Sequence, residues 1–155
     1  MRALIAALAL ILALSGAAAR DPEYCAIPGY LLFGGSDLTH VTAAVTKAHR
    51  LTIAVVGTGS SNLAGPDGPR SAYPARLEAA LRLRLPSVAV KVVTLVRSRY
   101  TAEDLAKGMT KLVVDEKPDL VIWQTGTVDA IRRIDPDIFR AALEEGVDKI
   151  GRAHV

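Results

Sequence analysis

The sequence has little cysteine and little net charge, and it lacks an apolar run long enough to span a bilayer. A single cysteine, Cys25, has no partner within the chain, so it is either a free thiol or pairs outside these 155 residues. The formal net charge of +3 is small and the basic residues are scattered, so nothing favours nucleic-acid binding. A membrane-spanning helix needs roughly 20 apolar residues, and no run reaches that length.

Residues 1–19 have the order of a secretory signal peptide. The basic Arg2 precedes an unbroken apolar run, Ala3–Leu14, and small residues follow up to Ala19, the expected cleavage site. Cleavage removes Arg2 and lowers the formal charge from +3 to +2. Cys25 follows a segment without the Leu-small-small pattern of lipoprotein processing. We therefore expect an exported protein, periplasmic in a bacterium or secreted, with no stable membrane anchor after cleavage.

Apolar runs typical of buried strands alternate with helical patterns in the rest of the chain. About 135 residues remain after the leader, enough for one modest domain. A lead-in covers residues 20–50 and contains a short helix that Ser36 or Asp37 caps and that ends near Lys47. The predicted strands are Leu51–Val56, Val88–Val93 and Asp119–Gln124. The predicted helices are Tyr73–Leu81, a helix that Thr101 caps with Asp104 in a capping box, and Pro136–Lys149. The apolar side of the last helix is expected to carry Ile138, Phe139, Ala142 and Leu143. This order predicts an α/β fold: a three-layer α/β/α, flavodoxin-like parallel sheet.

The loops after the first and third strands are the expected ligand site of such a sheet. Open parallel sheets bind ligands beyond the carboxyl ends of the strands, where the strand order reverses. Residues 57–65, GTGSSNLAG, lead into a helix, and residues 125–129, TGTVD, follow the third strand. A tight turn that needs glycine explains the first loop without any function, and a flavin-phosphate loop is a further interpretation. A dinucleotide fingerprint fits poorly, because Asn62 stands where it requires glycine.

A serine nucleophile is the remaining interpretation of the first loop. A serine hydroxyl is a weak nucleophile until a base takes its proton and N–H donors stabilise the oxyanion. Ser61 lies among small residues close to a helix start, where backbone N–H donors are available and a substrate can reach the hydroxyl. Ser61 is therefore the candidate catalytic residue.

The chain resembles the SGNH/GDSL hydrolase family in three blocks that occur in order. Residues 59–65, GSSNLAG, match its Gly-Asp-Ser-x-Thr-x-Gly block at the outer glycines and the serine. Residues 71–77, SAYPARL, resemble its Tyr-Pro-x-x-Leu helix start, and residues 119–127, DLVIWQTGT, its third strand and Gly-Thr-Asn-Asp block. The resemblance spans Leu51 to Asp148. It implies a serine hydrolase of SGNH type without cofactor, acting on the acyl or acetyl ester of a small molecule or glycan, with Ser61 as the nucleophile.

The departures from the family pattern surround the expected oxyanion hole. Ser60 replaces an aspartate, and Arg99 stands where the second block has a glycine. Val128 replaces the third-block asparagine, and loss of one such donor typically costs about 10²–10³ in rate. The resemblance implies oxyanion or binding positions at Gly59, Ser60, Asn62, Arg99, Gly126, Thr127, Val128 and Asp129.

The Asp-x-x-His pair that supplies the family's base lies near the family's C-terminus, and no such pair occurs in this sequence after the first predicted strand. His40 and His49 precede the first strand and are predicted to be surface or capping residues. Residues 150–155, IGRAHV, can be back-translated into a common sequencing-adapter string, which predicts a non-native tail containing His154. We therefore expect residues 51–149 to be a truncated hydrolase domain that is inactive as it stands. The alternative, supported by Val128, is a non-catalytic envelope protein that binds a glycan or ester ligand.

Overall fold

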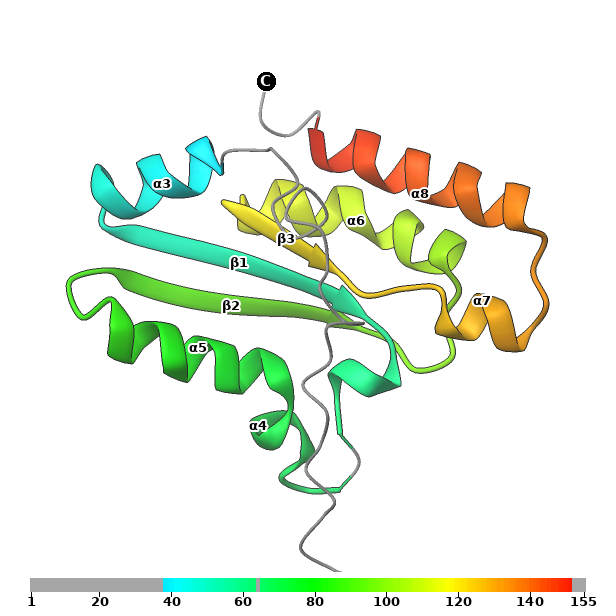
Figure 1. The fold of residues 1–155 in the computed structure, drawn as a ribbon, viewed down its shortest axis with the longest axis horizontal. Coiled ribbons are helices and arrows are strands. Elements are labelled where there is room, and N and C mark those ends of the chain that lie inside the picture. Colours follow the sequence, from blue (N-terminus) through cyan, green and yellow to red (C-terminus); the bar gives the residue numbers. More distant parts are fainter. Residues whose placement is uncertain (1–37, 64, 152–155) are drawn as a thin grey trace, which may run out of the picture. The chain divides into compact units, whose positions relative to one another are not determined.

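The computed structural model describes residues 38–63 and 65–151, in which strands and helices alternate (Figure 1). In chain order the elements are α3 (Thr39–Thr46), β1 (Arg50–Gly57), the 3-10 helix η2 (Gly59–Ser61), α4 (Gly68–Ser71), α5 (Tyr73–Arg84), β2 (Ala89–Val96), α6 (Ala102–Glu116), β3 (Leu120–Trp123), α7 (Thr127–Ile131) and α8 (Pro136–Gly151). Within these residues no helix is both long and apolar enough to cross a membrane. The predicted signal peptide and Cys25 lie outside the described residues.

The three strands form one parallel sheet in the order β2-β1-β3. β1 is the central strand; it pairs with β2 along its whole length and with β3 from Ile53 to Val56. All three strands therefore end at the same edge of the sheet. The strand order reverses between β1 and β3, so the expected switch point is present.

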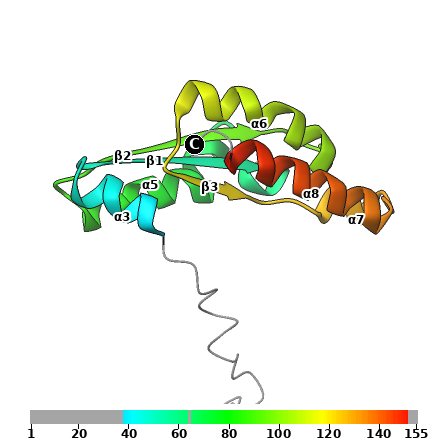
Figure 2. The ribbon, with the colours of Figure 1, turned by 90° about the horizontal axis from the view of Figure 1, so that it is seen from above.

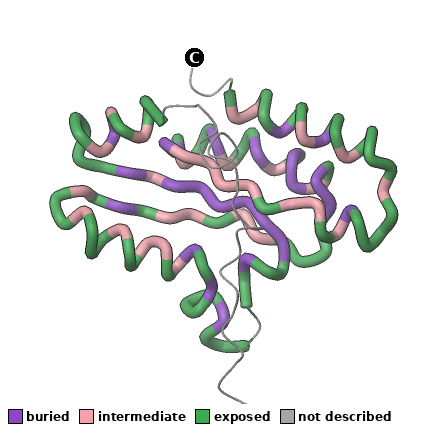
Figure 3. The backbone as a smooth tube through the Cα atoms, in the orientation of Figure 1, coloured by how far each residue is buried: buried purple, intermediate pink, exposed green. Residues whose placement is uncertain are grey.

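β1 is buried because helices cover both faces of the sheet (Figures 2 and 3). Ile53 and Val55 point to one face and pack against α3 and α5. Val56 points to the opposite face, where it packs with Leu105 and Met109 of α6. Alternate side chains of one strand thus serve two apolar layers, as a doubly covered strand requires. This arrangement confirms the predicted three-layer α/β/α fold class.

α6 begins with the capping box that its sequence predicts. The Thr101 hydroxyl accepts from the Asp104 N–H at 3.3 Å, and the Asp104 carboxylate accepts from the Thr101 N–H at 3.1 Å. These bonds satisfy N–H groups that have no partner within the helix. The start of α6 is therefore fixed next to the loop that follows β2.

The predicted start of the first helix is wrong. α3 begins at Thr39, and the capping position is Leu38, which makes no side-chain capping hydrogen bond. The proposed caps, Ser36 and Asp37, lie outside the described residues. The capping residue, Leu38, is therefore one or two positions later than Asp37 and Ser36, the polar residues expected to cap the helix.

Two details of the last helix are also corrected. α8 continues to Gly151, two residues beyond the predicted end at Lys149. Ile138 is 55% exposed, although its spacing placed it on the apolar side. The buried side of α8 is formed by Ala142 and Gly146, because small residues let the helix approach the sheet closely.

Candidate active site

Ser61 lies just beyond the carboxyl end of β1, in the 3-10 turn that the glycine-rich loop forms. Its backbone N–H donates to the Thr58 carbonyl at 2.9 Å, which closes the turn. The residue is 2% exposed, and its hydroxyl donates to Oε1 of Gln124. A Cβ at position 57 would overlap the Ser61 side chain, so Gly57 is required for this placement. The turn therefore fixes the serine by close packing.

Gln124 is a site residue that the sequence analysis did not single out. It directly follows β3, and its N–H donates to the Val56 carbonyl at 2.8 Å. Its side-chain oxygen accepts the Ser61 hydroxyl proton, but a neutral amide is not a base. Gln124 thus orients the hydroxyl without activating it. Its place as the last residue of the predicted strand 119–124 was the available signal.

Arg99 occupies a turn where the backbone favours glycine. The Tyr100 N–H donates to the Arg97 carbonyl at 3.4 Å, so residues 97–100 form a β-turn. Arg99 is the third residue of this turn and has φ 66°, a position at which type II turns favour glycine. Its N–H makes no hydrogen bond with any other described residue. The substitution in the second block therefore keeps a glycine-like backbone and an available donor.

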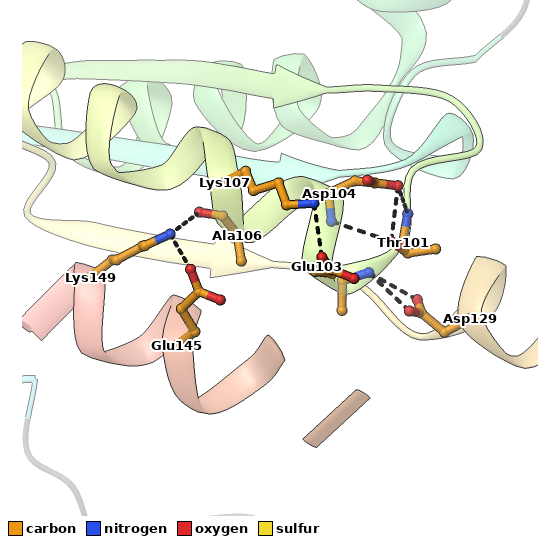
Figure 4. Close-up of polar contacts among 9 residues, drawn as sticks. Thr101, Glu103, Asp104, Ala106, Lys107, Asp129, Glu145 and Lys149 are labelled. Carbon is orange, nitrogen blue, oxygen red and sulfur yellow. Dashed lines mark hydrogen bonds and ion pairs between the residues drawn. The ribbon is translucent and has the colours of Figure 1, made fainter. Parts of the chain in front are cut away.

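A hydrogen bond from Ala102 at the start of α6 to the carboxylate of Asp129 connects α6 to the segment that follows β3 (Figure 4). This side chain is 4% exposed, and its two oxygens lie 3.0 and 3.2 Å from the Ala102 N–H. A helix N-terminus favours a carboxylate, because its N–H groups carry a partial positive charge. Asp129 therefore joins the first turn of α7 to the start of α6.

The structure places the loops that follow all three strands at one edge of the sheet. Ser61 contacts Gln124 at the end of β3, and a Cβ on Gly59 would lie 3.6 Å from Oγ of Ser98 in the loop after β2. The other predicted positions lie in two of these loops. In and after η2, Gly59, Ser60 and Asn62 are exposed. Before and within the first turn of α7, Gly126 has φ 97°, Thr127 is exposed and Val128 is half-buried.

The two described histidines lie at the opposite edge of the sheet. Nε2 of His40 is 3.4 Å from the carboxylate of Asp119, which also accepts from the Thr52 N–H at 2.8 Å. His49 immediately precedes β1, whose length places it roughly 20 Å or more from Ser61. Neither histidine can therefore accept the Ser61 proton in this arrangement.

The ionisable groups near the site are mostly paired. The pKa of Asp104 is lowered, first by the Thr101 N–H and then by the Thr101 hydroxyl, which both hydrogen-bond to its carboxylate. The pKa of Lys107 is raised by its hydrogen bond to Glu103 (Figure 4). Among the residues that the structure describes, no group of three or more His, Cys, Asp or Glu side chains could hold a metal ion.

The fold and the position of Ser61 define an α/β protein of SGNH hydrolase type. Residues 24–155 match the model of the non-GDSL lipase-like family, and the chain belongs to that family. This confirms the predicted relationship to the SGNH/GDSL hydrolases.

Solved structures, among them an SGNH-hydrolase family esterase, share the fold. TesA is 26% identical with a TM-score of 0.58, covering 66% of this chain and 55% of its own. AlinE4, an SGNH-hydrolase family esterase, is 25% identical with a TM-score of 0.56, covering 66% and 54%. The psychrotrophic esterase EstA from Pseudoalteromonas sp. is 18% identical with a TM-score of 0.57, covering 66% and 54%. The chain thus spans just over half the length of these proteins. No curated protein matches it.

Proposed function

We propose that this protein is an exported serine hydrolase of SGNH type that cleaves ester bonds, with Ser61 as its nucleophile. The observation that carries the proposal is the placement of Ser61 beyond the central strand, in a turn that requires Gly57. The membership in a lipase-like family and the similarity to AlinE4, an esterase, support the same reaction class. Residues 1–19 supply the export signal in this proposal.

The proposed reaction follows the chemistry of an activated serine. Oγ of Ser61 attacks the ester carbonyl carbon while a base takes its proton, and a tetrahedral intermediate forms. The backbone N–H groups of Ser61 and Arg99 donate to the oxyanion, so the Ser61 N–H must share or release the Thr58 carbonyl. The alcohol then leaves with the proton, and water releases the acid from the acyl-enzyme. The base is not among the described histidines.

Ester hydrolysis by the native protein tests this proposal. We expect turnover of p-nitrophenyl acetate to fall at least about 10³-fold in Ser61→Ala, because the nucleophile is removed. Ser87→Ala is the matched control: it removes an exposed serine hydroxyl in the turn between α5 and β2, outside the site, and should leave the rate unchanged.

Two results would contradict the proposal. Equal rates for the wild type and Ser61→Ala would place the chemistry elsewhere. A folded native protein that binds esters and never hydrolyses them would instead be a binding protein.

A further inference from the structure

A cavity of about 330 Å³ lies beside Ser61, between α5 and the carboxyl half of β2. Ser61 and Asn62 belong to its wall, and Pro74 and Ala75 come from the first turn of α5. Ligand pockets span about 300–1,000 Å³, so this cavity is at the small end of the range. Its size suits a small substrate group rather than a long acyl chain.

The carboxylate of Glu78 in the cavity wall already has a hydrogen-bond donor and an ion-pair partner. Oε2 of Glu78 accepts from the Val92 N–H at 3.0 Å, and Oε1 lies 2.5 Å from the guanidinium of Arg82. Glu78 therefore covers the free edge of β2, and Arg82 neutralises its charge. A ligand entering the cavity does not meet an uncompensated negative charge.

The positive charge in the cavity wall is not compensated. Arg97 donates from Nη1 to the carbonyl of the preceding residue, Val96, at 3.0 Å. Within the described part of the chain it forms no ion pair. A guanidinium with free donors binds carboxylates and phosphates through paired hydrogen bonds. The cavity thus combines small volume, mixed polarity and one available cation.

We infer that this cavity binds a small anionic group on the substrate of the proposed ester hydrolase, with Arg97 as the binding residue. The substrate class is a compact ester that carries a carboxylate a few bonds from the carbonyl, as in the half-ester of a short dicarboxylic acid. The inference rests on the proposed function, because it treats the cavity as part of the ester site.

Nuclear magnetic resonance titration of the full-length Ser61→Ala variant tests the inference, because this variant lacks the proposed nucleophile and leaves the esters intact. Monomethyl succinate carries the carboxylate, and dimethyl succinate is its neutral counterpart. We expect the monoester to bind about fivefold more tightly, since an exposed ion pair contributes up to about 1 kcal/mol. Its addition should shift the amide signals of Thr94 and Val96, which belong to the cavity wall. Arg97→Gln should abolish the difference between the two esters, and Arg84→Gln should retain it.

A second pair of variants tests the location of binding. Ala75→Phe fills the cavity and should weaken both esters at least fivefold, whereas Ala79→Phe places the same ring on an exposed position of α5 and should not. Equal affinities for the two esters, an unchanged preference in Arg97→Gln, or amide shifts away from β2 would overturn the inference. Each of these results leaves the Ser61→Ala rate comparison unaffected, so failure of one proposal is distinguishable from failure of the other.

Discussion

The residue that departs furthest from the family pattern, Arg99, keeps the backbone of the glycine it replaces. The sequence alone predicts a penalty at this position, because a side chain restricts a left-handed backbone. The structure shows the left-handed φ of 66° and a free N–H. Val128 differs, since its side chain offers no hydrogen-bond donor.

Arg99→Gly should stabilise the fold slightly. The left-handed conformation costs a non-glycine residue about 1–2 kcal/mol, and glycine loses about 0.5–1 kcal/mol more backbone entropy on folding. We expect the free energy of unfolding to rise by about 0.5–1 kcal/mol in urea titrations. Arg99→Ala, which keeps a Cβ, should show no such gain. A loss of stability in Arg99→Gly would contradict the strained turn.

The capping box of α6 makes the free energy of unfolding depend on pH, through the carboxylate of Asp104. The folded-state pKa of Asp104 lies below its unfolded value, so the folded protein binds fewer protons than the unfolded one. The contribution of Asp104 is therefore complete above the unfolded pKa of about 3.9 and is lost as pH falls through the folded pKa. Unfolding titrations at several pH values should show this loss, and Asp104→Asn should remove it. An unchanged acid dependence in the variant would contradict the assignment.

At the scale of elements, the sequence predicts long periodic segments well and short ones poorly. All three strands and the helices that became α5, α6 and α8 are present, because their buried faces repeat over many residues. The elements η2, α4 and α7 are too short to show a period, so tertiary contacts decide them. The sequence does not predict Gln124 as a site residue for a related reason: its contact with Ser61 depends on how the strands pair.

The packing of α8 depends on one glycine. A Cβ on Gly146 would overlap the ring of Trp123 in β3, closer than real contacts allow. Gly146→Ala should therefore lower the free energy of unfolding by about 1–3 kcal/mol, as overpacking usually does. Gly151→Ala is a suitable control, since its Cβ meets nothing within 4 Å. Equal stabilities of the two variants would show that α8 does not approach β3 this closely.

On the scale of the whole molecule, parallel pairing in the order β2-β1-β3 explains why three loops far apart in sequence form one site. The sequence predicted this edge and its nucleophile candidate from glycine placement and strand order. It could not predict that Ser61 would be buried against Gln124, because that contact joins residues 63 positions apart. The molecule therefore holds a positioned serine whose activating base is not one of its described histidines.

Covalent labelling of the native protein with a fluorophosphonate, followed by peptide mass spectrometry, tests the central claim most directly. Such a reagent reacts with a serine whose proton is taken by a base and whose oxyanion is stabilised. The account predicts one adduct, on the peptide that contains Ser61, and no adduct in Ser61→Ala. An adduct on another residue, or a folded native protein that remains unlabelled, would contradict it.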